Sequence, residues 1–262
     1  HERHLDLLGR VEMSPFASVS NLGATVEGRD LDLVTVGRPA PGKRPVWIIA
    51  RQHPGESMAE WFVEGLLERL LDGADPVARR IREKAVLYIV PNMNPDGAIR
   101  GNLRTNAAGA NLNREWREPD PARSPEVLLV RQAMEASGVD LFLDIHGDEE
   151  IPHVFTAGCE GNPGYTPRLA ALEEDFRSRL VGIGAEFQTR FGYPRDEPGQ
   201  ANLTLACNAV GQAFDCLSFT IEMPFKGHDD NPQPGTGWNG ARSKGLAQAV
   251  LSVLAALAPR LR

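Results

Sequence analysis

The chain has few cysteines, no long apolar run and no excess of positive charge, and each absence excludes a class of protein. Its three cysteines, in 262 residues, include no C-x-x-C pair. This argues against a disulfide framework and favours buried free thiols in a reducing cytoplasm, with a Cys207–Cys216 bond as the alternative. No apolar run approaches the ~18–20 residues that cross a membrane. The net charge of −7 argues against nucleic acid as the main partner.

Length and composition suit one globular domain. With 42% hydrophobic residues the chain can bury a sizeable core, although two small domains would also fit its length. We found no internal repeat and no low-complexity linker, so we expect one domain over 1–262. The first residues, "HERHLDLLGR", are charged, helical in pattern and without methionine, and we expect an upstream part to be missing.

Short apolar runs alternate with longer amphipathic ones, which predicts an α/β domain with a largely parallel sheet. The strand-like runs are 31–36, 46–51, 86–91, 141–146, 203–208 and 217–223, and the helix-like runs are 57–71, 76–84, 125–137, 167–182 and 241–258. In such a sheet the ligand site lies beyond the carboxyl ends of the strands. Two long stretches rich in Gly, Pro and Asn, 92–116 and 226–240, are expected to be functional loops.

A histidine and a glutamate stand three residues apart where the second of these strands ends. In "RQHPGES" His53 closes the strand, Pro-Gly turns the chain, and Glu56 begins the next helix. An imidazole and a carboxylate at this spacing can hold one metal ion. The pattern H-x-x-E is also common by chance, and a polar turn whose acid favours the helix dipole is the alternative.

A second strand end strengthens the metal interpretation. In "LFLDIHG" the side chains alternate, so Phe142, Asp144 and His146 share one face. His146 would then complete a His–Glu–His set with an open fourth position, which is typical of a catalytic zinc. Calcium and magnesium prefer an all-oxygen shell, so two histidines favour zinc.

A third strand end offers a base. In "LSFTIEMPF" Glu222 shares a face with Thr220 while Phe219 and Ile221 face the other way. Burial there would raise the pKa of the carboxyl toward the range of a general base. An ordinary salt-bridged glutamate is the alternative.

These segments together resemble the zinc carboxypeptidase family, specifically its cytosolic carboxypeptidase branch. The matching pieces are "HPGES", "PNMNPDGAIRGNLR", "GANLNREW", "LDIHG" and "FTIEMPF", in that order. The resemblance implies a compact fold with a mixed, mostly parallel sheet of about eight strands between helices. It implies one zinc ion held by His53, Glu56 and His146, with Glu222 as the general base that accepts a proton from the attacking water.

The resemblance also assigns the substrate-binding arginines. Arg104 matches the arginine that stabilises the developing oxyanion. Asn113 and Arg114 match the pair that grips a peptide's terminal carboxylate, which a guanidinium fork suits well. The expected activity is therefore that of a metallocarboxypeptidase, a hydrolase acting on the C-terminus of a peptide or protein.

Three departures from the family pattern stand out. The tyrosine that closes over the substrate has no secure match, and Tyr193 is the nearest candidate. The β-rich domain that precedes the catalytic domain in the cytosolic branch is absent, in keeping with an expected missing start. Asn111 occupies a place where most of the family has an aspartate behind a zinc-bound histidine, here His53.

Two other functions remain open from the sequence. An amidohydrolase of N-acyl amino acids would use the same ligands and base, and a non-catalytic relative would bind C-terminal tails without cutting them. The resemblance to the cytosolic branch suggests a preference for acidic C-terminal residues, and four basic residues could bind their side chains. These are Arg100, Arg117, Arg195 and Lys226.

Overall fold

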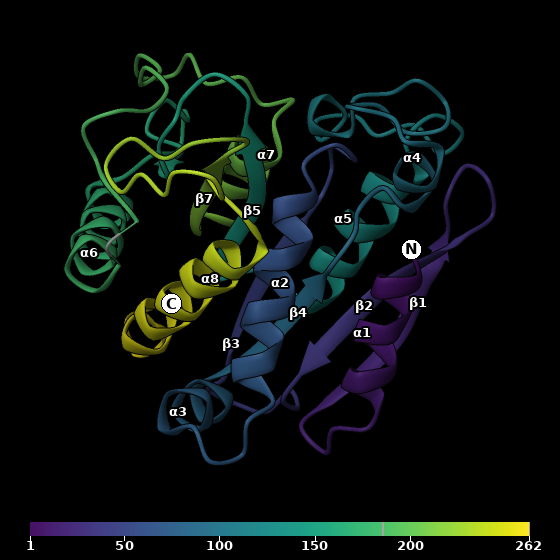
Figure 1. The fold of residues 1–262 in the computed structure, drawn as a ribbon, viewed down its shortest axis with the longest axis horizontal. Coiled ribbons are helices and arrows are strands. Elements are labelled where there is room, and N and C mark those ends of the chain that lie inside the picture. Colours follow the sequence, from purple (N-terminus) through teal and green to yellow (C-terminus); the bar gives the residue numbers. More distant parts are fainter. Residues whose placement is uncertain (185, 262) are drawn as a thin grey trace.

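The computed structural model describes residues 1–184 and 186–261. Its centre is a seven-stranded sheet in the order β1-β2-β4-β3-β5-β7-β6 (Figure 1). The strands are β1 (Ala17–Ala24), β2 (Asp30–Val36), β3 (Arg44–Ala50), β4 (Ala85–Val90), β5 (Leu141–Asp148), β6 (Phe155–Ala157) and β7 (Leu217–Pro224). The α/β fold with a mixed sheet agrees with the sequence prediction. The sheet has seven described strands, whereas the resemblance implied about eight.

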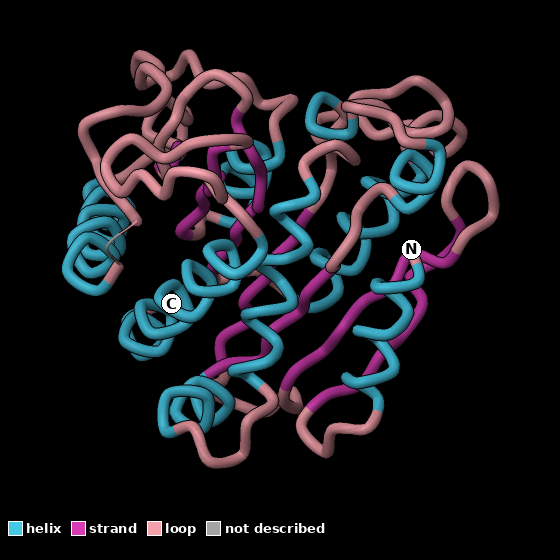
Figure 2. The backbone as a smooth tube through the Cα atoms, in the orientation of Figure 1, coloured by secondary structure: helices cyan, strands magenta, loops and turns pink. Residues whose placement is uncertain are grey.

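Parallel pairing is confined to the middle of the sheet. β4, β3, β5 and β7 run parallel to one another, whereas β1, β2 and β6 pair antiparallel at the two sides. The carboxyl ends of the four central strands therefore meet at one edge. Figure 2 shows the long loops gathered at the edge toward which β5 and β7 run.

Helices cover both faces of this sheet. They are α1 (Glu2–Glu12), α2 (Ser57–Leu70), α3 (Pro76–Lys84), α4 (Pro95–Arg100), α5 (Pro125–Ser137), α6 (Pro167–Ile183), α7 (Ala206–Phe214) and α8 (Gly240–Leu257), with short 3₁₀ turns at Leu112–Arg114 and Ala258–Arg260. One core packs α1, α2, α6 and α8 on one face, and a second packs α5 and α7 on the other. None of the described helices is long and apolar enough to cross a membrane.

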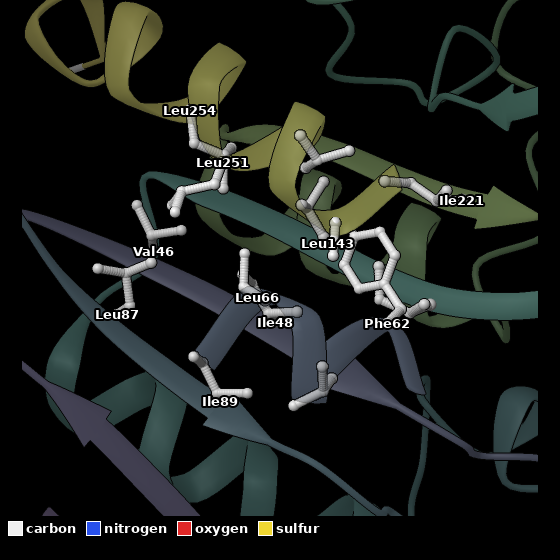
Figure 3. Packing of buried hydrophobic residues seen from close by; sticks show 14 of the residues in the cluster. Val46, Ile48, Phe62, Leu66, Leu87, Ile89, Leu143, Ile221, Leu251 and Leu254 are labelled. Carbon is white, nitrogen blue, oxygen red and sulfur yellow. The ribbon is translucent and has the colours of Figure 1, made fainter. Parts of the chain in front are cut away.

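The strand alternation expected from the sequence is present. Leu143 of β5 and Ile221 of β7 enter the first core beside Phe62 of α2, as Figure 3 shows. Phe142 instead enters the second core. The face opposite α2 and α8 therefore also carries Asp144 and His146, which lie two and four residues after Phe142, and Glu222, the register partner of His146.

One strand prediction was wrong. Residues 203–208, "LTLACN", contain no strand, because helix α7 begins at Ala206. Tertiary contacts override the local β preference: the backbone N–H of Ala206 donates to Asn113 Oδ1 at 2.9 Å. The places beside β7 in the sheet are already filled by β5 and β6.

Four elements were missed by the sequence reasoning, namely β1, β6, α4 and α7. β1 is an edge strand with no fully buried residue, so it carries no apolar run to signal it. The short α4 lies inside a stretch that was read as irregular. Its start is marked by Asn94, whose side chain accepts from Gly97 N.

Candidate active site

The candidate site is assembled at the carboxyl ends of β3, β5 and β7. His53 and Glu56 lie in the turn between β3 and α2, while His146 and Glu222 are direct register partners on β5 and β7. All four side chains are at least nine-tenths buried. The structure thus brings together the four residues that the sequence singled out at three separate strand ends.

The turn that carries His53 is held in an unusual backbone conformation. Arg51 has φ 60°, a region that non-glycine residues seldom adopt and that clusters at functional sites. Its guanidinium bridges the turn, donating to Pro54 O at 3.0 Å and to Glu60 at 2.6 Å. Arg51 therefore fixes the path of the chain between β3 and α2.

Gly55 lets the neighbouring loop approach this turn. Its N–H donates to Leu103 O at 2.9 Å, and a Cβ on Gly55 would lie 2.9 Å from that same oxygen. Any larger residue would push the loop away. The close approach places Arg104, the next residue of the loop, beside the His53–Glu56 turn.

The three ligand candidates converge through matching atoms. His53 Nδ1 lies 2.6 Å from Glu56 Oε1, and His146 Nδ1 lies 2.7 Å from Glu56 Oε2. The two imidazoles are tilted by 60° with centroids 4.9 Å apart. Both Nδ1 atoms and the carboxylate are thus directed at one small volume, and together they form a potential metal-binding group.

The opposite nitrogen of each imidazole is also held. His53 Nε2 lies 2.9 Å from Asn111 Oδ1, as the sequence reasoning expected. His146 Nε2 lies 2.8 Å from Asp144 Oδ2, and that oxygen also accepts from Gln52 Nε2 at 2.7 Å. Partners of this kind fix the ring orientation and the tautomer that leaves Nδ1 free to bind a metal. One histidine is therefore supported by a carboxylate and the other by an amide.

Electrostatics within this cluster are strong because it is buried. Burial alone would raise the pKa of Glu56, but His146 and His53 lower it to about 2. Burial alone would lower the pKa of His146, but Asp144 and Glu56 raise it well above its usual value. The negative charges of Glu56 and Asp144 would favour a metal cation bound between these groups.

Glu222 is a buried carboxylate with a raised pKa. Burial raises its pKa to about 8, and Glu56 adds to this effect while His146 opposes it. Its Oε2 atom is buried and has no hydrogen-bond partner among the described residues. Its other oxygen accepts from the Tyr193 hydroxyl at 3.2 Å, and the same hydroxyl lies 2.5 Å from Asp148 Oδ2. Tyr193, the nearest candidate in the sequence for the tyrosine that closes over the substrate, therefore lies at the site.

Arg104, Asn113 and Arg114 lie near one another on the loop that follows α4. Partial burial and the like charge of Arg104 lower the pKa of Arg114. Asn113 is buried, and its Oδ1 accepts from Ala206 N. Its amide N–H₂ group is therefore directed away from Ala206. Arg114 Nη1 donates to Asn113 O at 2.7 Å. Two cations and an amide donor therefore share one region, as a carboxylate site needs.

A cavity of about 310 Å³ lies against Tyr193, the residue whose hydroxyl contacts Glu222. Its lining includes Tyr193, Thr220, Arg177 and Arg195. The sequence reasoning missed Arg177, because this residue lies on α6, far from every motif. Of the four basic residues named from the sequence, Arg195 lines the cavity, whereas Arg100 pairs with Glu27 and Arg117 lines a different hollow.

Comparison with known proteins decides the family. The family model described as zinc carboxypeptidase matches residues 7–230. The chain belongs to the zinc carboxypeptidase family. It is accordingly a metallocarboxypeptidase-type hydrolase with zinc as its cofactor, and the His53, Glu56 and His146 group is its potential zinc site.

Bacterial relatives of this zinc carboxypeptidase match nearly its whole length. A metallo-carboxypeptidase from Pseudomonas aeruginosa, solved in complex with (2-guanidinoethylmercapto)succinic acid, is 63% identical with a TM-score of 0.96, covering 100% of this chain and 70% of that one. A metallo-carboxypeptidase from Burkholderia cenocepacia is 51% identical with a TM-score of 0.95, covering 98% and 69%. These similarities confirm the fold.

Curated relatives include members of the branch named from the sequence. Cytosolic carboxypeptidase 4 of Mus musculus is 40% identical over 149 residues, which are 53% of this chain and 13% of the mouse protein. An uncharacterized protein of Zymomonas mobilis is 51% identical over 260 residues, 99% of this chain and 68% of that protein. The chain therefore corresponds to part of longer proteins.

The donor atoms fit zinc. Two imidazole nitrogens and one carboxylate make a catalytic zinc set with a position left for water or substrate. The Nε2 atoms are engaged elsewhere, so the Nδ1 atoms are the ones available. On the neighbouring strand β7, Glu222 Oε2 is buried without a hydrogen-bond partner in the described part of the chain.

Replacing Asn111 by aspartate should tighten zinc binding. Asn111 Oδ1 accepts from His53 Nε2, and a carboxylate there would make the imidazole a stronger donor to the metal. Changes behind a ligand alter metal affinity by ~10–100-fold, so Asn111→Asp should retain zinc at a chelator concentration about that much higher. The measurement is competition against a graded chelator.

A matched control for this variant is Asn239→Asp, which adds the same charge at the N-cap of α8 and should leave zinc retention unchanged. Equal or weaker retention in Asn111→Asp would mean that the new charge pairs with Arg114 instead of supporting His53.

Proposed function

We propose that the protein removes single residues from the C-terminus of peptides or proteins in the cytoplasm, with Glu222 as general base. One observation carries this proposal: the buried Glu222 carboxylate has an oxygen without a hydrogen-bond partner among the described residues, and it is the register partner of His146 in the His–Glu–His set. Zinc held by His53, Glu56 and His146 supplies Lewis-acid chemistry, lowering the pKa of water and polarising a carbonyl.

Residues of the chain itself would transfer the proton of the attacking water. Glu222, with its pKa raised by burial, accepts a proton from the attacking water and returns one to the leaving amine. The Tyr193 hydroxyl, at 3.2 Å from Glu222 Oε1, holds the carboxylate in place and covers the substrate. Arg104, beside the His53–Glu56 turn, stabilises the negative charge that develops on the carbonyl oxygen.

Asn113 and Arg114 would bind the terminal carboxylate. The Asn113 amide is oriented by Ala206 N, and a guanidinium forms two parallel hydrogen bonds with a carboxylate. This requirement for a free carboxylate restricts cleavage to the last peptide bond. N-acyl amino acids also present a carboxylate, so an amidohydrolase is the main alternative.

A library experiment separates these functions. The zinc-loaded protein is incubated with mixed peptides and N-acyl amino acids, with a chelated sample as control, and the products are analysed by mass spectrometry. Zinc-dependent loss of single C-terminal residues is the expected result. Cleavage of acyl amino acids alone would support the amidohydrolase, and no turnover would support a binding protein.

We infer an acidic preference from the cavity that Tyr193 lines. The Arg177 side chain is nine-tenths buried there and donates to Glu160 at 2.7 Å, with Glu173 at 3.3 Å. Burial raises the pKa of Glu173 to about 7, with Glu160 adding to the effect, which reduces the negative charge around Arg177. Arg177 would then bind the carboxylate of a C-terminal glutamate or aspartate in competition with Glu160.

Replacing Arg177 by glutamine should remove this preference. A hydrogen bond to a charged group contributes ~1.5–3 kcal/mol, so the ratio of kcat/KM for C-terminal glutamate over leucine should fall by ~10–100-fold in matched peptides. Arg195→Gln is the control, because the Arg195 side chain is 71% exposed and should change the ratio much less.

A basic preference is the competing possibility. The ligand of the Pseudomonas relative is named as a guanidino compound, and Glu160 and Asp196 also line this cavity. Faster release of arginine, leucine or phenylalanine than of glutamate by the wild-type protein would overturn the acidic assignment. Circular dichroism of Arg177→Gln serves as the check that the variant keeps its fold.

A further inference from the structure

We propose that His153, His228 and Asp230 form a second metal site, suited to Zn²⁺, separate from the zinc ligands at the strand ends. One ligand atom of each residue lies within 4.8 Å of the other two. His153 belongs to the loop between β5 and β6, and His228 and Asp230 belong to the loop between β7 and α8. The site would therefore join two loops that are distant in sequence.

His228 provides the strongest indication of a ligand. Its Nε2 lies 2.6 Å from the backbone oxygen of Glu186, and because a carbonyl can only accept, Nε2 carries the proton. Nδ1 then has a free lone pair. This atom is buried and has no hydrogen-bond partner within residues 1–184 and 186–261. Burying such an atom without a partner costs ~1–3 kcal/mol, and a bound cation would remove that cost.

The other two ligands are already oriented. His153 Nδ1 lies 3.0 Å from Asp230 Oδ2, while Asp230 Oδ1 accepts from Arg190 Nη2 at 2.6 Å. Arg190 thus holds one carboxylate oxygen and leaves the other directed at the histidine. A carbonyl behind His228 and a guanidinium behind Asp230 are the kind of outer partners that orient metal ligands.

The chemistry of the donors selects the ion. Two imidazoles and one carboxylate favour zinc over calcium or magnesium, which prefer oxygen ligands. Both histidines are buried and Asp230 is exposed, so water can complete the coordination from the Asp230 side.

The position of this site links it to the active site. Phe191 stacks on His153 with centroids 4.4 Å apart, and Arg190 binds Asp230. Both residues belong to the segment that carries Tyr193, whose hydroxyl contacts Glu222. An ion on His153, His228 and Asp230 would therefore fasten this segment beside the base.

Zinc stoichiometry tests the proposal. The full chain is stripped of metal and titrated with Zn²⁺ against a chromophoric chelator. We expect two equivalents of different affinity. Asp230→Asn and His153→Gln should each lose the weaker equivalent and keep the tighter one. Asp229→Asn, a neighbouring exposed acid outside the group, should keep both.

Cobalt absorption isolates the second site. In His53→Ala, which disrupts the first site, Co²⁺ should still give the visible bands of a bound ion, and these should disappear in His53→Ala/Asp230→Asn. A wild-type chain that binds a single equivalent would overturn the proposal. So would a second equivalent that survives both Asp230→Asn and His153→Gln, since it would then lie elsewhere.

Discussion

Glu222→Gln is expected to lower kcat by ~10²–10⁴ or more, the contribution of a positioned general base, while zinc content and fold stay unchanged. The amide keeps the shape of the side chain at the end of β7 but cannot accept a proton from water. Steady-state kinetics on a peptide substrate, together with elemental analysis of the same sample, measure the two quantities.

The control for this variant is a second buried glutamate. Glu126 on α5 is fully buried, and burial raises its pKa as it does that of Glu222. Glu126→Gln makes the same chemical change away from the zinc ligands and should keep near-native kcat. A Glu222→Gln protein that retained full zinc and near-native kcat would show that another group accepts the proton.

His53→Ala should lose the catalytic zinc and, with it, activity. The variant removes one of two imidazoles directed at Glu56, and its effect should exceed the ~10–100-fold loss of affinity typical of changes behind a ligand. Elemental analysis after gel filtration should show one zinc equivalent fewer than in the wild-type protein.

His4→Ala provides the comparison for this loss. His4 is also buried and lies between two carboxylates, at 2.7 Å from Glu60 and 3.1 Å from Asp32. Because it belongs to neither of the potential metal-binding groups found among the described residues, its replacement should leave the zinc content unchanged. If His53→Ala held as many zinc equivalents as the wild-type chain, the ligand assignment would be wrong.

The parts of the site that were predictable from the sequence are those that follow from strand periodicity. A parallel sheet aligns its strand ends, so residues that close separate apolar runs, such as His53, His146 and Glu222, can be placed together without knowing the fold in detail. Alternation likewise predicted that Asp144 would share a face with His146, and the structure brings the two into contact.

The parts that could not be predicted depend on contacts between distant segments. Arg177 reaches the cavity lined by Tyr193 from α6, and nothing in its local helical pattern distinguishes it from a surface arginine. The run at 203–208 has the composition of a strand, yet Asn113 binds Ala206 N where α7 begins. The His153–His228–Asp230 group joins two loops that no local motif connects.

The measurement that tests the central claim most directly compares two peptides that differ in one group. One has a free C-terminal carboxylate and the other a C-terminal amide. The zinc-loaded wild-type protein should release the last residue of the free acid and cleave the amide ~10–100-fold more slowly, because a hydrogen bond to a charged group contributes ~1.5–3 kcal/mol. Equal turnover of both peptides, or cleavage at internal bonds, would contradict a carboxypeptidase that recognises the terminal carboxylate through Asn113 and Arg114.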